Sequence, residues 1–158
     1  MRCIRPVRFE EAQALSSLCK RSKAHWGYDS EFMRRAEASL TVTTQEIAQE
    51  GVLVCEDENS ITGVISVVPM ADEGVFDLMH LFVEPHAIGK GVGRALFLAA
   101  VSLMRERGGT KLLILSDPNA AEFYRRMGAI DIGEASSDAI PERLLPLLVF
   151  VFGSWRGS

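Results

Sequence analysis

The spacing of apolar residues predicts a strand followed by helices at the start of the chain. Apolar side chains alternate over Arg2 to Arg8, which is typical of a short strand. Helical spacing follows in two longer segments and one short turn: Glu10 to Ala24, Glu31 to Ser39 and Thr44 to Gln49. We expect Asp29 or Ser30 to cap the second helix, because a short polar side chain there accepts a hydrogen bond from the first helical N–H groups.

Valine and isoleucine dominate the middle of the chain and predict three strands there: Gly51 to Glu56, Ile61 to Met70 and Val75 to Glu84. The first two flank a polar turn at 57–60, so we expect them to form a hairpin. Unbroken alternation along the third would place Asp77 on one face. The opposite face would then carry Phe76, Leu78, His80, Phe82 and Glu84.

Helices and strands alternate in the second half. Val92 to Arg107 is apolar on most faces, which predicts a helix buried against a sheet and ended by the glycines at 108 and 109. The remaining predicted elements are a strand at Lys111 to Ser116, a helix at Asn119 to Met127 and strands at Ala129 to Ala135 and Leu145 to Phe152. Asp117 is expected to cap the second of these helices, with Pro118 as its first residue and Gly128 as its end.

The element order is βααββββαβαββ, which predicts an α/β fold with one mixed sheet and helices on both of its faces. A chain of 158 residues has the length of one domain with one sizeable core. We therefore expect residues 1–158 to form a single domain.

Composition narrows the function classes. The net charge of −4 leaves no basic surface for nucleic acid and modestly favours a cationic substrate. The odd cysteine count, at Cys3, Cys19 and Cys55, predicts neither a disulfide framework nor a metal site. The charged N-terminal sequence is unlike a signal peptide, and the longest apolar stretch is too short to span a membrane. A cytoplasmic protein with no membrane partner is expected.

A glycine-rich loop carries the main functional signal. Gly89, Gly91 and Gly93 alternate between a strand end at Pro85 and a helix that begins near Val92. Glycines let the backbone approach a ligand closely, and a helix start offers free N–H groups to phosphate. The spacing matches neither the Walker loop nor the dinucleotide fingerprint.

The order of strand, Gly-x-Gly-x-Gly loop, apolar helix, strand and a short helix carrying Phe123-Tyr124 and ending at Gly128 resembles the GNAT N-acetyltransferase superfamily. The resemblance covers Arg2 to Phe152 in element order, and its motif runs from His80 to Gly128. It implies a mostly antiparallel seven-stranded sheet. It also implies direct transfer of the acetyl group of acetyl-CoA to a primary amine of a small molecule or peptide.

The resemblance also assigns a cofactor site. The family signature (Gln/Arg)-x-x-Gly-x-(Gly/Ala) falls on Ile88, Gly91 and Gly93, and Ile88 departs from it. In the family, the next helix opens with an asparagine. Asp117 occupies that position here, and Asn119 follows two residues later. Either residue could contact the cofactor. Implied pyrophosphate contacts are Gly89, Lys90, Gly91, Val92, Gly93 and Arg94, and implied pantetheine contacts are the backbones of Leu81, Phe82 and Val83.

Tyr124 matches the family position that protonates the departing CoA sulfur. A phenol is protonated at neutral pH and can act as such an acid. The base that takes the amine proton is left open between Glu84 and His80, which would share one face of the strand. The family's usual oxyanion donor is a backbone N–H near Val83.

The acceptor pocket is expected in the connection between the first two helices. Trp26 and Tyr28 lie there and would either bind a cationic amine or pack the loop onto the core. Two other functions stay open, a non-catalytic CoA-binding sensor or interaction module and a nucleotide-binding regulatory domain. The acceptor's identity and a possible homodimer also stay open.

Overall fold

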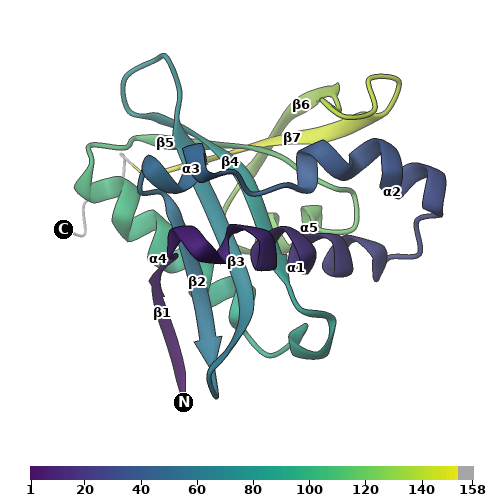
Figure 1. Ribbon diagram of the computed structural model, residues 1–158. Helices are drawn as coiled ribbons and strands as arrows, with labels where there is room; N and C mark the ends of the chain where they lie inside the picture. The colour runs from purple at the N-terminus through teal and green to yellow at the C-terminus, as the bar shows by residue number, and fades with distance from the viewer. Residues whose placement is uncertain (153–158) are drawn as a thin grey trace.

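The computed structural model describes residues 1–152, in which helices and strands follow closely on one another (Figure 1). The elements are β1 (Arg2–Pro6), η1 (Phe9–Glu11), α1 (Ala12–Ala24), α2 (Ser30–Ala36), η2 (Glu37–Leu40), α3 (Thr44–Ala48), β2 (Val52–Asp57), β3 (Ser60–Pro69), β4 (Val75–Val83), η3 (Pro85–Ala87), α4 (Val92–Glu106), β5 (Lys111–Leu115), α5 (Ala121–Arg126), β6 (Ile130–Ser136) and β7 (Leu144–Val151). Residues 153–158 of the predicted domain lie outside the described residues. No helix within residues 1–152 is long and apolar enough to cross a membrane.

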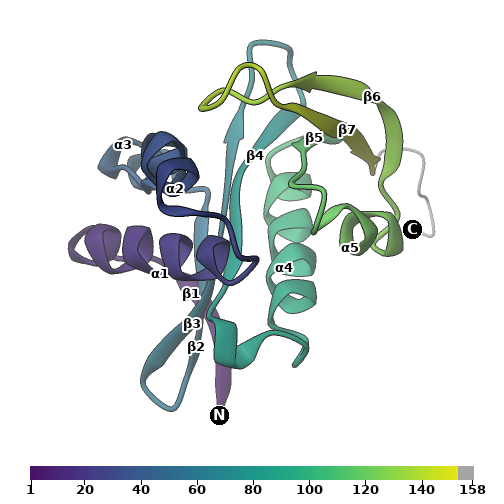
Figure 2. The ribbon, with the colours of Figure 1, turned by 90° about the vertical axis from the view of Figure 1, so that its right-hand side faces the viewer.

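Within residues 1–152 the strands form one seven-stranded sheet in the order β1-β2-β3-β4-β5-β7-β6. Within these residues every neighbouring pair is antiparallel except β4 and β5, which run parallel. Helices α1, α2 and α3 cover one face, and α4 and α5 cover the other (Figure 2). The mixed, mostly antiparallel seven-stranded sheet with helices on both faces is thereby confirmed. The order βααββββαβαββ is wrong by one strand, because three strands, not four, lie between the N-terminal helices and α4 in the described chain.

Two apolar layers hold the helices to the sheet. On the α4 face, Phe97 and Met104 pack against Ile65 and are fully buried. On the α1 face, Leu15 of α1 packs with Val64 and other buried residues. Fully burying one such side chain contributes roughly 1.5–3 kcal/mol. The alternation of β3 therefore anchors both layers at once.

Local capping explains where two of the helices begin. Asp29 caps α2 by accepting a hydrogen bond from the N–H of Phe32 at 2.8 Å, which confirms one of the two expected caps. Thr43 and Glu46 form a reciprocal capping box at the start of α3.

Helix α5 begins later than the sequence predicts. Asp117 does not cap it, because its carboxylate accepts the N–H of Asn119 at 2.8 Å and forms a turn over Pro118 instead. The helix therefore starts at Ala121. Its predicted end at Gly128 is confirmed: this glycine has a φ of 110°, a conformation that favours glycine.

A β-bulge in β4 interrupts the alternation along this strand. Ser66 of β3 lies opposite His80, but Val67 lies opposite Leu78, so Met79 is an extra residue without a partner. Two residues of β4 therefore span the distance of one on β3. Side chains before and after Met79 change faces as a result.

The bulge corrects the predicted faces of β4. Phe76 and Leu78 belong to the apolar layer on the α4 side. His80 contacts α3 and Phe82 packs in the layer on the α1 side, so these four residues do not share one face. Asp77, predicted to lie on the opposite face from His80, lies opposite Val68 of β3 and hence on the same face as His80.

The parallel strands β4 and β5 diverge soon after they meet. Val75 to Asp77 pair with Lys111 to Leu113, and no further pairs follow in the described chain. Beyond Asp77, β4 continues to Val83 while β5 turns toward α5. The β5-facing edge of β4 is therefore left without a neighbouring strand.

A cluster of charges joins the helical layer to the second half of the sheet. Asp117, just after β5, accepts hydrogen bonds from the ammonium of Lys23 on α1 and from the Tyr28 hydroxyl, the latter at 2.9 Å. Arg143, just before β7, donates to the Tyr28 hydroxyl at 2.6 Å, and its Nη2 lies 3.6 Å from a carboxylate oxygen of Asp117. We call Lys23, Tyr28, Asp117 and Arg143 the Asp117 cluster.

The Asp117 cluster is largely withdrawn from water. The side chains of Lys23 and Asp117 are 12% and 14% exposed. Burial raises the pKa of Asp117, but Lys23 and the hydrogen bonds from Asn119 and Tyr28 outweigh burial and hold the pKa below its usual range. The carboxylate is therefore charged in the folded protein at neutral pH.

Replacing Asp117 by asparagine should destabilise the protein in a pH-dependent way. We expect a loss of about 3 kcal/mol at neutral pH, because the buried ammonium of Lys23 loses its countercharge. A carboxylate whose pKa is lower in the folded than in the unfolded protein stabilises the fold fully above its unfolded pKa, about 3.9 for aspartate. This stabilisation is lost as the pH falls through the folded pKa. Thermal unfolding should therefore show the difference between wild type and Asp117→Asn shrinking only in acid.

The matched control for this prediction is Asp131→Asn. Asp131 also pairs with an arginine, Arg125, but this pair is exposed to solvent, so its loss should change stability little. A difference between wild type and Asp117→Asn that stays constant into strong acid would contradict the assigned charge state.

Candidate active site

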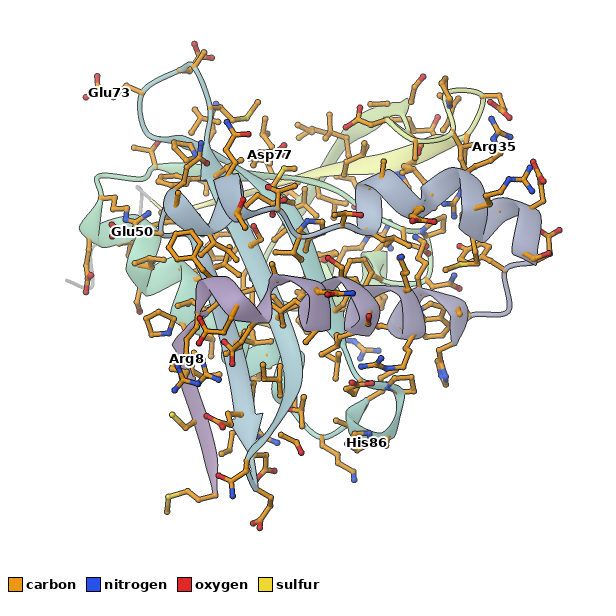
Figure 3. All side chains as sticks on the ribbon, in the orientation of Figure 1. Arg8, Arg35, Glu50, Glu73, Asp77 and His86 are labelled. Atoms are coloured by element: carbon orange, nitrogen blue, oxygen red, sulfur yellow. The ribbon has the colours of Figure 1, made fainter. Side chains whose placement is uncertain are left out.

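A cleft of about 720 Å³ opens where β4 and β5 diverge. Its walls come from α1, α2, β4, β5, α5 and the segment between β6 and β7. Leu81 of β4, Leu113 of β5 and Tyr124 of α5 line its interior. Arg35 of α2 pairs with Glu142 of the β6–β7 segment and bridges two of these walls (Figure 3).

The glycine loop adopts a conformation that requires glycine. Gly89 and Gly91 have φ values of 85° and 84°, and Gly91 is the residue that precedes α4. The guanidinium of Arg2 donates to the carbonyl of Lys90 at 2.7 Å and ties the loop to the first strand. The backbone path into α4 is therefore set by both conformation and an anchor.

The start of α4 offers free backbone donors. The first helical hydrogen bond runs from Ala95 to the carbonyl of Gly91, so the N–H groups of Val92, Gly93 and Arg94 have no helical acceptor. The macrodipole of this helix adds partial positive charge at the same end. Of the loop residues, Gly93 and Ile88 line the cleft. This arrangement is suited to a phosphate group.

The unpaired edge of β4 offers donors in the extended conformation. Glu84 donates its N–H to Thr62 on the β3 side at 2.8 Å, so by alternation the N–H of Val83 points away from β3. There it donates to the hydroxyl of Ser22 at 3.4 Å, a long and therefore weak bond. The N–H of Leu81 points the same way by the same alternation. A ligand with amide groups could pair with this edge as an added strand.

Tyr124 lies in the wall of the cleft. Only 5% of this residue is exposed, and its ring packs against those of Phe97 and Phe123. Within residues 1–152 its hydroxyl has no hydrogen-bond partner. Burial, and secondarily the carboxylate of Asp117, raise the pKa of Tyr124 above its usual value. The phenol is therefore a protonated, unengaged donor at neutral pH.

His80 also lines the cleft, and 3% of it is exposed. Its Nε2 lies 3.1 Å from a carboxylate oxygen of Glu46, and Ser66 donates to the same oxygen at 2.8 Å. Its Nδ1 is buried and has no partner among the described residues.

Glu84, the alternative base, is separated from the cleft. Its carboxylate makes two hydrogen bonds to the guanidinium of Arg21 on α1, at 3.1 and 2.5 Å. It is not among the residues that line the cleft. The structure therefore places the two candidate bases in different environments, and of the two it is His80 that lines the cleft.

The aromatic loop divides between two roles. Trp26 lines the cleft and is 47% exposed. Tyr28 does not line it: its ring stacks on Phe32 with centroids 4.0 Å apart, and its hydroxyl belongs to the Asp117 cluster. The amide of Asn119 donates to Tyr28 and to Asp117, so Asn119 contacts two members of this cluster. Asp117 itself lines the cleft.

Three polar residues that line the cleft lie outside the sequence motif: Ser22, Asp77 and Asp138. Ser22 continues the buried face of α1 after Leu15, Leu18 and Cys19, and a polar residue at that spacing is a signal that the sequence does carry. Asp77 and Asp138 both line the cleft, where Asp77 projects from β4 (Figure 3). Burial, and secondarily the charge of Asp138, raise the pKa of Asp77.

Comparison with known proteins agrees with this geometry. The sequence profile of the acetyltransferase (GNAT) domain matches residues 48–128, about half of the chain. A comparison with curated proteins finds no significant match.

Solved structures share the fold over nearly the whole chain. The PaiA N-acetyltransferase of Thermoplasma acidophilum, in complex with coenzyme A, has a TM-score of 0.79 at 16% identity, covering 96% of this chain and 99% of that one. A GNAT acetyltransferase of Brucella melitensis, in complex with acetyl-CoA, has 0.69 at 20% identity, covering 97% and 89%. One from Streptococcus pneumoniae has 0.71 at 17%, covering 97% and 100%.

These identities are low, so the solved structures establish the shared fold. The family rests on the sequence profile, whose match spans β2 to the end of α5 and includes the glycine loop and Tyr124. Together with the diverging strands and the free start of α4, this match shows that the chain belongs to the GNAT acetyltransferase domain family.

Proposed function

We propose that this protein is an N-acetyltransferase that moves the acetyl group of acetyl-CoA directly to a primary amine of a small molecule or peptide. Residues 1–158 would act as one domain. One observation carries the proposal: the divergence of β4 and β5 brings the glycine loop, the unpaired edge of β4 and the Tyr124 hydroxyl around one cleft.

The cleft fits acetyl-CoA in three respects. The free N–H groups at the start of α4 suit the pyrophosphate. The edge N–H groups of Leu81 and Val83 suit the amide-containing pantetheine arm. Two of the structurally similar acetyltransferases were crystallised with coenzyme A or acetyl-CoA, which supports the same co-substrate here.

Acetyl transfer requires a proton donor for the departing sulfur. The amine nitrogen attacks the thioester carbonyl, a C–N bond forms, and the C–S bond breaks to leave a thiolate. Tyr124 would donate its hydroxyl proton to this thiolate. Its raised pKa means that the hydroxyl carries its proton at neutral pH.

The negative charge on the carbonyl oxygen needs a hydrogen-bond donor. The N–H of Val83 points into the region between β4 and α1, where its bond to Ser22 is 3.4 Å long. A carbonyl oxygen would replace such a weak bond at small cost, and its developing charge would strengthen the new one.

The amine must lose a proton before or as it attacks. We propose His80 as the base in preference to Glu84, because Glu84 is held by Arg21 outside the cleft lining. Trp26 would contact the acceptor, and the carboxylates of Asp77 and Asp138 would favour a cationic one.

Ligand binding and an acceptor screen test the proposal together. Acetyl-CoA and CoA should raise the melting temperature by mass action, whereas NAD and ATP should not. A panel of primary amines with acetyl-CoA should then release free thiol, followed with a thiol reagent. No shift with CoA would contradict the cofactor site, whereas a shift without thiol release from any amine would favour a non-catalytic CoA-binding module.

Substitution of Gly93 tests the pyrophosphate site. A Cβ here would lie 3.5 Å from the Phe123 ring, an ordinary contact, and an aspartate near a helix start does not weaken the helix. Gly93→Asp should nevertheless lower CoA affinity roughly 100-fold or more, because like charges brought together cost several kcal/mol. The neutral isostere Gly93→Asn is the control, and isothermal titration should show a much smaller loss. Equal affinities of the two variants would place the phosphates elsewhere.

Tyr124→Phe tests the acid. The ring is kept and only the hydroxyl is lost, so kcat should fall roughly 10- to 10³-fold while the acetyl-CoA affinity stays unchanged. Steady-state kinetics with an acceptor from the screen measures the first, and the thermal shift with acetyl-CoA measures the second. Turnover at the wild-type rate would make Tyr124 a packing residue.

A further inference from the structure

Glu46 is a carboxylate buried beneath the sheet, on the helix α3 that packs against His80. Only 7% of it is exposed. One oxygen accepts from the Ser66 hydroxyl at 2.8 Å, and the other accepts from the Thr43 N–H at 3.2 Å. His80 Nε2 lies 3.1 and 3.4 Å from the two oxygens. A carboxylate in such a place needs this many donors to stay charged.

The contact between Glu46 and His80 sets the proton position on the imidazole. A charged carboxylate only accepts hydrogen bonds, so the proton of the neutral ring must be on Nε2. Nδ1 then carries the lone pair, and Nδ1 is the buried atom without a partner in the described chain. The unengaged nitrogen is thus the one able to accept a proton.

The charge state of Glu46 supports this arrangement. Burial raises the pKa of Glu46, but His80, Ser66 and Thr43 outweigh burial and hold it below its usual range. The other groups near the pair are Cys19 on α1, whose pKa burial raises to about 12, the hydroxyl of Ser66 on β3, and Asp77 on the same face of β4. At neutral pH Cys19 is therefore uncharged and Glu46 is charged.

Glu46 lies outside the acceptor cleft. It lines a second cavity of about 370 Å³ between α3 and the ends of β3 and β4, together with Thr43, Val68 and Met79. His80 lines both this cavity and the cleft, whereas Glu46 lines only the second cavity. Glu46 can therefore act on a bound amine only through His80.

We propose that Glu46 is a positioning residue for acetyl transfer: it holds His80 as the Nε2–H tautomer and stabilises the imidazolium that forms when Nδ1 takes the amine proton. This inference rests on the proposed function. As the C–N bond forms, the N–H bond of the amine breaks and its proton moves to Nδ1. When the products leave the cleft, His80 releases this proton to water and Tyr124 takes one from water, which replaces the proton that it gave to the sulfur.

Glu46 also has a structural role, because it closes the capping box of α3 with Thr43. Two variants separate the roles. Glu46→Gln keeps an amide oxygen that can accept from Thr43 but removes the charge. Thr43→Ala weakens the cap but leaves the contact between Glu46 and His80 in place. A purely structural role predicts similar effects of the two variants on catalysis.

The first measurement needs no acceptor. Nitrogen NMR of histidine-labelled protein reports which ring nitrogen carries the proton, and His80→Gln identifies the His80 signals among the three histidines. In the wild type above neutral pH we expect a protonated Nε2 and an unprotonated Nδ1. In Glu46→Gln we expect a mixture of tautomers, and in Thr43→Ala the wild-type pattern. A wild-type ring protonated on Nδ1 overturns the proposal, even where Glu46→Gln fails to fold.

The second measurement is the pH profile of kcat with an acceptor from the amine screen. Glu46→Gln should lower kcat roughly 10- to 100-fold at neutral pH, a part of what a general base contributes. The acidic limb of the kcat profile of Glu46→Gln should move to lower pH, because the imidazolium loses its countercharge. The KM of this variant for acetyl-CoA should stay unchanged. Thr43→Ala should keep the wild-type limb.

The outcomes separate this inference from the proposed function. A wild-type enzyme that acetylates an amine while Glu46→Gln keeps both the wild-type limb and the wild-type kcat overturns the role of Glu46 alone. The same shift of the limb in Thr43→Ala also overturns it, since the cap would then be the cause. A wild type that binds acetyl-CoA but acetylates no amine contradicts the proposed function and, with it, the role of His80 as a base.

Discussion

The divergence of β4 from β5 is the constraint on which the candidate site depends. Parallel pairing is limited to Val75–Asp77 with Lys111–Leu113, and beyond it the β4 edge has free backbone groups. Unpaired backbone is costly when it is buried without water or a ligand. Here it lines an open cleft, with α4 packed beneath the sheet and α5 carrying Tyr124 on the far wall. One break in pairing thus places both a free strand edge and Tyr124 at the same cleft.

The Asp117 cluster joins the walls of the cleft, because Lys23, Asp117 and Arg143 all line it. Lys23 and Tyr28 come from the helical layer, and Arg143 comes from the segment before β7, so one carboxylate joins three parts of the chain. Buried charges are tolerated only when each has a partner of opposite charge or a hydrogen bond. The cluster meets this condition, because its one carboxylate lies among two cations and a phenol. The same wall presents Asp117 to the cleft, so the cluster shapes the place where an acceptor would bind.

The bulge at Met79 sets the surroundings of His80, the candidate base that lines the cleft. It returns Phe76 and Leu78 to the α4 layer and places His80 against α3. Glu84, beyond the end of β4, is drawn to Arg21 on α1. A one-residue insertion in β4 therefore separates the residues that pack under α4 from His80, which contacts α3.

The sequence alone determined most helices and strands and the glycine loop, because periodicity, capping and positive φ are local properties. It predicted one strand too many and an early start for α5. The position of Tyr124 in a short helix before Gly128 followed from the same local signals. Only the tertiary structure decided the faces of β4, because a bulge depends on the register of the neighbouring strand. It alone paired Glu46 with His80 and Lys23 with Asp117, which are 34 and 94 residues apart. Such contacts arise from packing of distant elements, and no local pattern of apolar and polar residues encodes them.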